Sequence, residues 1–210
     1  MKPYIVAVTG ASGVIYGIKL VQALIDMERD VALVVSEQAR VVLQEEMGIS
    51  SQDIVHPENL HHVFGPSASR CITLYSPKDF TAPIASGSYP VEGMVVIPCT
   101  MGTLGAIACG TSQNLIHRAA DCAIKEGRKL VLVPRETPLN AIHLENMLKL
   151  SRLGVSMVAA MPAFYSGEKS VEDMIHFMVG KVLDQLGIAH ALYPRWTGKK
   201  MEPFTLTGDL

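Results

Sequence analysis

Charged residues are scarce in this chain: Asp, Glu, Lys and Arg make up 18% of its 210 residues, against about 25% in an average soluble domain. The charges that are present nearly cancel, to a formal net charge of −2. No apolar run reaches the roughly 20 residues that a membrane-spanning helix needs, because glycine, proline or a charged residue interrupts each one. We therefore expect neither a nucleic-acid partner nor a membrane span.

Cysteine is also rare, and the spacing of the thiols excludes the usual metal sites. The chain has no C-x-x-C pair, and the adjacent His61 and His62 have no further ligand at metal spacing. The N-terminus runs directly into a strand pattern, without the layout of a signal peptide. We expect reduced thiols, a cytoplasmic protein and no metal site. The four cysteines are Cys71, Cys99, Cys109 and Cys122.

Apolar residues, by contrast, make up 49% of the chain, which is long enough for one large domain with a sizeable core. This fraction is high for a monomer, so we expect part of the apolar surface to be buried between the subunits of a homo-oligomer. Residues 50–91 are polar and rich in Pro, Ser and Gly, which predicts a long irregular excursion. A second irregular segment is predicted at 196–210.

Strand-like and helix-like patterns alternate along the chain and predict an α/β fold. Because the strand runs are almost entirely apolar, we expect a Rossmann-like, doubly wound, mainly parallel sheet with helices on both faces, in a single domain over 1–210. The predicted strands are Tyr4–Val8, Val31–Val35, Met94–Ile97, Leu130–Val133 and Val155–Ala159. The predicted helices are Val14–Met27, Glu37–Met47, Leu104–Ala108, Gln113–Glu126, Leu139–Arg152 and Val171–Leu186.

The first strand breaks into a glycine-rich turn, Thr9–Gly13, directly before a helix. Backbone N–H groups and the helix dipole favour an anion at such a place, although an ordinary tight turn has the same composition. Dinucleotide sites usually carry an acidic residue after the second strand. Here Ser36 stands at that position, which favours a phosphate or a flavin over an adenosine ribose.

Further candidates follow the other strands, because ligands of open parallel sheets bind beyond the carboxyl ends of the strands. A second turn of small residues spans Pro98–Thr103, Arg135 follows the next strand, and Tyr165 comes after the last. Two glycine and hydroxyl turns, an Arg and a Tyr would suit a phosphorylated, ring-bearing ligand such as FMN.

Three charged residues, Arg118, Asp121 and Lys125, share one face of a predicted helix. Their spacing favours a solvent-facing row of ion pairs, and a cationic clamp for a second phosphate is the alternative. Tyr165 and Lys169 have the Y-x-x-x-K spacing of short-chain dehydrogenases. Because Ser and Gly lie between them, a loop is the better prediction.

Seven ordered blocks, spread over essentially the whole chain, are informative together. They are TGASG (Thr9–Gly13), APIASGS (Ala82–Ser88), PCTMGTL (Pro98–Leu104), NLIHRAADCAIKE (Asn114–Glu126), LVLVPRETPL (Leu130–Leu139), IHLENMLKLSRLG (Ile142–Gly154) and LYPRW (Leu192–Trp196). This set resembles the UbiX-type flavin prenyltransferases. The resemblance implies that reduced FMN accepts a dimethylallyl unit from dimethylallyl monophosphate, at N5 and then C6, without a metal. It also implies a homo-oligomer, a dodecamer in this family, and a UbiD-type decarboxylase that receives the prenylated FMN.

The resemblance assigns roles position by position. The implied FMN-binding residues are Gly10, Ala11, Ser12, Ser36, Thr100, Met101, Gly102, Thr103 and Arg135. The implied substrate-binding residues are Phe80, Ser86, Arg118, Lys125, Tyr165, Lys181 and Trp196. The implied catalytic residues are Ser12, which would relay a proton near N5, together with Glu46, Lys125 and Glu136.

The chain also departs from the family pattern. Phe80 stands where Trp is usual, Lys181 replaces an Arg, and Met101 occupies a position often held by a hydroxyl residue. These departures leave open the reaction rate and the choice between monophosphate and diphosphate donors. Two other functions stay open as well: a flavin-dependent decarboxylase, and a non-catalytic FMN carrier that would have no use for Arg118 or Lys125.

Overall fold

The computed structural model describes residues 2–165 and 170–198 of the chain. The chain forms two compact units, Met1–Ala160 and Met161–Leu210. The first carries the β-sheet, and the second carries one long helix, α9 (Val171–Leu186). No helix within the described ranges is long and apolar enough to cross a membrane.

The sheet of the first unit has six parallel strands. They are β1 (Tyr4–Val8), β2 (Val31–Val35), β3 (Ile72–Tyr75), β4 (Gly93–Cys99), β5 (Leu130–Pro134) and β6 (Ser156–Met157). Their order is β3-β2-β1-β4-β5-β6, so the chain starts in the middle and winds outward in both directions. This confirms the predicted doubly wound parallel fold.

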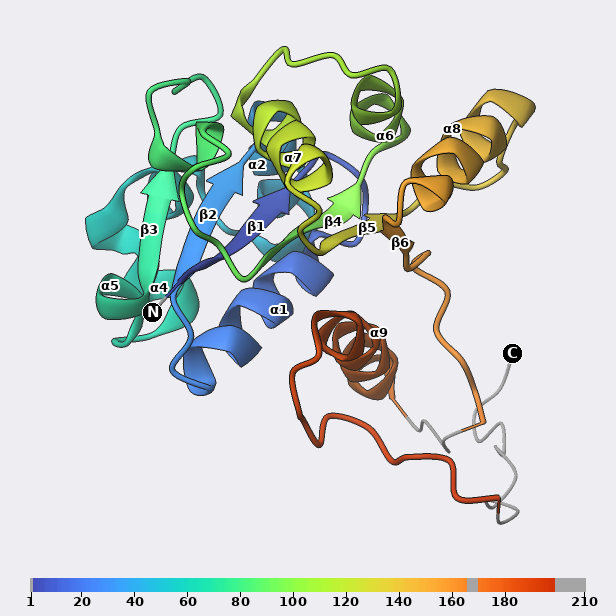
Figure 1. The fold of residues 1–210 in the computed structure, drawn as a ribbon. Helices are drawn as coiled ribbons and strands as arrows, with labels where there is room; N and C mark the ends of the chain where they lie inside the picture. Colours follow the sequence, from blue (N-terminus) through green and yellow to red (C-terminus); the bar gives the residue numbers. More distant parts are fainter. Residues whose placement is uncertain (1, 166–169, 199–210) are drawn as a thin grey trace. The chain divides into compact units, whose positions relative to one another are not determined.

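Helices cover both faces of the sheet, which explains why every residue of β1, β2, β4 and β5 is buried. The helices of this unit are α1 (Val14–Asp26), α2 (Glu37–Met47), α3 (Ser51–Val55), α4 (Leu60–Phe64), α5 (Ala68–Cys71), α6 (Met101–Ala108), α7 (Leu115–Lys125) and α8 (Ala141–Arg152). Figure 1 shows α1 on one side of the sheet and α7 on the other. Gly17 lets α1 approach the sheet closely, because a Cβ there would lie 2.6 Å from the carbonyl oxygen of Ile97.

The predicted irregular excursion over 50–91 is more regular than its composition indicates. It contains α3, α4, α5, two 3₁₀ turns at Pro57–Asn59 and Pro83–Ala85, and β3, which pairs with β2. β3 is an edge strand and only its first residue is buried, so its apolar pattern is weak. At the opposite edge, β6 is two residues long where five were predicted. Residues 196–198 have no regular structure, and the rest of the predicted irregular tail lies outside the described residues.

Candidate functional site

Two turns meet where β1 and β4 lie side by side, at the point where the strand order reverses. The side-chain hydroxyl of Thr9 joins them: it donates to the carbonyl oxygen of Pro98 at 2.7 Å and accepts from the N–H of Thr100 at 2.9 Å. Thr9 is buried. The turn after β1 and the turn after β4 are therefore held together at the crevice where parallel sheets bind ligands.

The N-terminus of α1 is occupied by a carboxylate of the protein itself. Gly13 has a left-handed backbone with φ of 89°, and no side chain of the turn caps the helix. Instead, Glu46 near the end of α2 accepts hydrogen bonds from the N–H groups of Gly13 at 2.9 Å and Val14 at 3.3 Å. Glu46 thus lies against the turn that carries Gly10, Ala11 and the exposed Ser12.

The N-terminus of α6 is open, in contrast to that of α1. Thr100 caps the helix and its hydroxyl accepts from the N–H of Thr103 at 3.1 Å. Apart from the neighbouring residues and the backbone of its own helix, a Cβ added at Gly102 would have no atom nearer than the Thr100 hydroxyl at 4.0 Å. Since the other N–H groups of a first turn have no acceptor within the helix, Met101 and Gly102 offer two donors beside open space. This end can take an anion.

Two more predicted residues lie at the carboxyl ends of β2 and β5. Ser36 caps α2 and accepts from the N–H of Ala39 at 3.1 Å. Arg135 follows β5, and its side-chain Nε is buried without a hydrogen-bond partner among the described residues. A buried donor without an acceptor is costly, so Arg135 is suited to an acceptor on a bound group. Together with the α6 N-terminus, the Arg135 Nε offers hydrogen-bond donors of the kind that a phosphorylated ligand accepts from.

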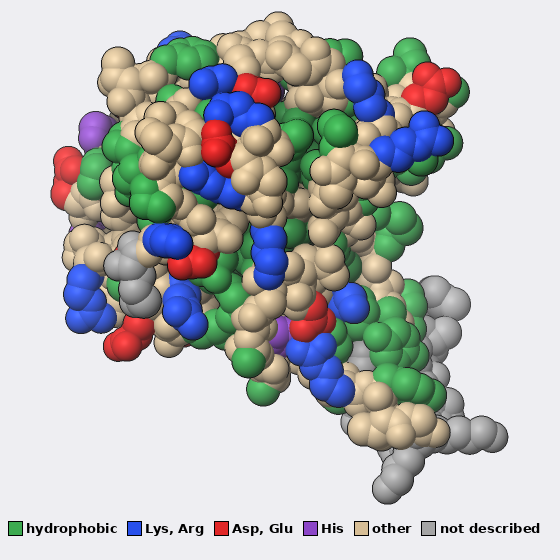
Figure 2. All heavy atoms as spheres, in the orientation of Figure 1, with side chains coloured by type: hydrophobic (Ala, Val, Ile, Leu, Met, Phe, Trp, Pro, Cys, Tyr) green, Lys and Arg blue, Asp and Glu red, His purple; other side chains and the backbone are tan. Residues whose placement is uncertain are grey.

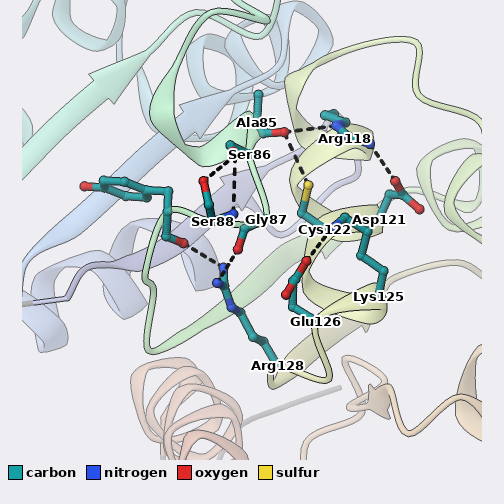
Figure 3. A network of polar contacts seen from close by, with 11 residues as sticks. Ala85, Ser86, Gly87, Ser88, Arg118, Asp121, Cys122, Lys125, Glu126 and Arg128 are labelled. Carbon is teal, nitrogen blue, oxygen red and sulfur yellow. Dashed lines mark hydrogen bonds and ion pairs between the residues drawn. The ribbon is translucent and has the colours of Figure 1, made fainter.

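Helix α7 presents the predicted donor-binding cations beside the loop Ala85–Tyr89 (Figure 3). Arg118 donates through Nε to the carbonyl oxygen of Ala85 at 3.0 Å and pairs with Asp121 at 2.9 Å. Lys125 pairs with Glu126. The expected row of ion pairs is therefore present at Arg118, although the partner of Lys125 is Glu126 and not Asp121.

Arg128, which follows the end of α7, binds the same loop through two backbone carbonyl groups. Its guanidinium donates to the carbonyl oxygens of Tyr89 at 2.8 Å and Gly87 at 2.5 Å. Figure 3 shows Arg128 beside Gly87. Ser86, a predicted pocket-wall residue, is held within this loop, and its hydroxyl lies 2.9 Å from that of Ser88. Arg128 and Thr9 were missed by sequence reasoning, because their partners are backbone groups distant in the chain.

The remaining predicted residues of the first unit are exposed. Phe80 is 49% exposed, and Glu136 accepts from the N–H of Thr137 at 3.0 Å. Basic and acidic side chains are interspersed on the face seen in Figure 2, in keeping with the small net charge. The described residues hold no group of three or more His, Cys, Asp or Glu side chains that could bind a metal.

The second unit carries three of the predicted substrate-binding residues, and it brings two of them, Tyr165 and Trp196, into contact. The Tyr165 ring meets Trp196 edge to face at 6.0 Å and Phe177 at 5.9 Å. The Nζ of Lys181 lies 4.0 Å from an oxygen of Asp184. Lys169, the second member of the Y-x-x-x-K spacing, lies outside the described residues.

Comparison with known proteins found similar sequences and structures that cover most of the chain. Residues 1–183 match the model of the family described as Flavoprotein. A protein of Halalkalibacterium halodurans named flavin prenyltransferase UbiX is 51% identical over 193 residues, which is 92% of each chain.

Two solved structures are similar over nearly their whole length. AnUbiX (PadA1), crystallised with FMN and dimethylallyl pyrophosphate, is 38% identical with a TM-score of 0.84, over 94% of this chain and 98% of that one. A dodecameric FMN-dependent UbiX-like decarboxylase from Escherichia coli O157:H7 is 44% identical with a TM-score of 0.83, over 94% of this chain and all of that one.

Proposed function

We propose a flavin prenyl transfer for this chain, which belongs to the flavoprotein family and, within it, to the UbiX-type flavin prenyltransferases. It joins the dimethylallyl group of dimethylallyl monophosphate to N5 and C6 of reduced FMN, without a metal. The observation that carries the proposal is the donor set at the switch point of the sheet: the open α6 N-terminus and the Arg135 Nε, which has no hydrogen-bond partner in the described part of the chain.

The FMN site would be built from the ends of four strands. Gly10, Ala11, Ser12, Ser36, Thr100, Met101, Gly102, Thr103 and Arg135 are its proposed members. Reduced FMN supplies the electron-rich nitrogen and carbon that are alkylated. The protein positions the donor next to these atoms, and holding both reactants in contact accounts for much of the acceleration.

The cations of the proposed donor site stabilise the leaving phosphate. When the C–O bond of the donor breaks, negative charge develops on the phosphate, and Arg118, Lys125 and Lys181 supply fixed positive charge in place of a metal. Tyr165 adds a directional hydroxyl, and Phe80, Ser86 and Trp196 are the residues proposed to contact the prenyl chain. The π faces of Phe80 and Trp196 attract the allylic cation.

Proton transfer is assigned to the turn after β1. The Oγ of Ser12 and the carboxylate of Glu46 lie around the same helix start, since Glu46 is bonded to Gly13. We assign them the proton that must leave the alkylated position. Glu136 is the second proposed acid, beside Arg135.

The direct test is anaerobic. The purified protein is mixed with reduced FMN and dimethylallyl monophosphate, quenched, and the flavin is weighed by mass spectrometry. A flavin heavier by one five-carbon unit, absent when the donor is left out, supports the transferase. An unchanged flavin with both the monophosphate and the diphosphate donor overturns it.

Direct decarboxylation is the second candidate, because one similar solved structure is that of a protein named an FMN-dependent decarboxylase. A non-catalytic FMN carrier is the third. Lys125→Gln and Glu136→Gln separate them: a transferase loses turnover and keeps FMN, whereas a carrier is indifferent to both changes. A decarboxylase releases CO₂ from an aromatic acid without any prenyl donor.

Three further features belong to this proposal. We propose that the chain forms a homo-oligomer, a dodecamer as in the E. coli protein, and four large apolar side chains exposed on and after α8 support burial between subunits: Ile142, Leu144, Leu148 and Leu153. The product would be passed to a UbiD-type decarboxylase. All four cysteines are free, which agrees with a cytoplasmic location.

A further inference from the structure

One carboxylate in the second unit, Asp184 near the end of α9, accepts four hydrogen bonds. Its Oδ1 accepts from Arg195 Nη2 at 2.7 Å and faces Nε2 of His190 at 3.1 Å. Its Oδ2 accepts from Arg195 Nη1 at 2.7 Å and from the Tyr193 hydroxyl at 2.6 Å. A carboxylate has about four lone-pair sites, so all the acceptor capacity of Asp184 is used.

The hydrogen bond from His190 follows from its tautomer. The N–H of Leu192 donates to Nδ1 of His190 at 3.2 Å, so the neutral ring carries its proton on Nε2 and donates it to Asp184. The His190 side chain has no exposed surface. The residues 190–195 are thus fastened to α9 through one carboxylate.

The pKa shifts of Asp184 and Tyr193 show that these two groups keep their protonation states over the physiological pH range. The Arg195 guanidinium holds the pKa of Asp184 well below its ordinary range, so the carboxylate is charged at every physiological pH. Burial and the charge of Asp184 raise the pKa of Tyr193 to about 12, so the phenol stays a donor. The bidentate Arg195 pair is the strong form of such a contact.

Gly180 provides a second, independent observation. It lies in the interior of α9, where glycine is unfavourable. A Cβ at this position would lie 2.5 Å from a ring carbon of Tyr193 and 2.7 Å from one of His190. The helix therefore has a glycine where the segment 190–195 lies directly on it.

Residues of this contact also lie next to three residues that the proposed function uses: Tyr165, Trp196 and Lys181. Phe177 packs against both Tyr193, at 4.9 Å between ring centroids, and Tyr165, at 5.9 Å. Trp196, the next residue after Arg195, meets Tyr165 edge to face. Lys181 forms only a long ion pair with Asp184, at 4.0 Å, which is beyond hydrogen-bond distance. The four hydrogen bonds that Asp184 accepts come from other donors.

We propose that Asp184 is a positioning residue for the prenyl donor: it fastens residues 190–195 to α9, which places Trp196 against Tyr165 and leaves the Lys181 ammonium for the donor phosphate. This inference rests on the proposed function for the identity of the donor. The fastening itself does not depend on that function and can be measured separately.

Trp196 is the only tryptophan of the chain, so its fluorescence reports on the fastened segment alone. The test compares Asp184→Asn and Gly180→Ala with the full-length wild type. Glu172→Gln is the matched control, since it removes a carboxylate from the same helix three turns earlier. Two quantities are measured: the fast, local component of the Trp196 anisotropy decay, and the KM and kcat for dimethylallyl monophosphate with reduced FMN.

We expect both variants to increase the fast component and to raise the donor KM by on the order of tenfold, with a smaller change in kcat and in FMN affinity. Combining the two changes adds little to either one, because both release the same segment. Glu172→Gln behaves as wild type. An unchanged anisotropy decay in Asp184→Asn overturns the inference. A rise in donor KM that is matched by equally large falls in kcat and in FMN affinity overturns it as well.

Milder variants keep the inference testable if Asp184→Asn does not fold. Tyr193→Phe removes one hydrogen bond, and Arg195→Lys keeps the charge while losing the bidentate contact. Both should give intermediate anisotropy and KM, and wild-type values in both would overturn the inference. If the wild type transfers no prenyl group at all, the proposed function fails, whereas the anisotropy comparison still decides whether Asp184 fastens the segment.

Discussion

The carboxylate of Glu46 accepts a hydrogen bond of 2.9 Å from the backbone N–H of Gly13, although 33 residues separate the two in the chain. An anion at this place interacts favourably with the positive end of the α1 dipole. The contact therefore brings an acid to the turn that carries Ser12, and it uses the N–H groups that glycine-rich turns commonly offer to a phosphate.

Glu46→Gln should separate catalysis from folding. The amide still accepts from Gly13 but cannot exchange the proton, so we expect prenyl transfer to slow by about a hundredfold or more, with FMN still bound. The loss of charge at the helix end should cost about 0.3–1 kcal/mol in urea unfolding. Glu45→Gln, one residue earlier and exposed, is the control. A full transfer rate in Glu46→Gln would remove the proposed role.

Thr9→Val tests the link between the two turns. Valine has nearly the same shape but leaves the Pro98 carbonyl and the Thr100 N–H without their partner, so we expect a loss of about 1–3 kcal/mol in the free energy of unfolding. FMN affinity should fall as well, since the turn after β4 is no longer fixed. Thr73→Val on the exposed face of β3 is the matched control. The idea fails if both variants have the same stability and affinity.

Arg135→Met should weaken FMN binding without lowering the stability of the apoprotein. Hydrogen bonds to charged groups contribute about 1.5–3 kcal/mol, so FMN affinity, measured by flavin fluorescence, should fall by about 10- to 150-fold. The urea stability of the apoprotein should not decrease, because the variant removes a buried Nε without a partner. Arg70→Met, an exposed change, is the control. Undiminished FMN affinity would contradict the proposed contact.

His117 predicts a dependence of stability on pH. Burial lowers the pKa of His117, so the folded protein resists its protonation while the unfolded chain binds a proton near pH 6.5. The contribution of His117 to the free energy of unfolding is therefore fully present above about pH 6.5, and it is lost as the pH falls below that value. Urea unfolding between about pH 5 and 8 should show a flatter curve for His117→Gln than for wild type. The control His56→Gln, at an exposed site, should keep the wild-type slope.

Much of the fold was predictable from local patterns. The bounds of β1, β2, α2 and α9 agree with the predicted ranges. Fully apolar strands and amphipathic helices can be predicted from the hydrophobic pattern of a short stretch of sequence. The parallel sheet followed from the same patterns, and the family followed from the ordered blocks; both are confirmed. β3 was not predicted, since an edge strand with one buried residue has little apolar pattern.

The contacts within the candidate site could be predicted only in part from local sequence. Local sequence identified Ser36 and the turn Pro98–Thr103 as candidates, because they follow predicted strands. The structure adds that Ser36 and Thr100 cap the helices that begin there. Local sequence could not show that Glu46 bonds to Gly13, that Thr9 joins two turns across 89 and 91 residues, or that Arg128 holds the loop Gly87–Tyr89. Each of these contacts joins distant parts of the chain, and its partner is chosen by strand order and helix packing, which arise only when the whole sheet has formed.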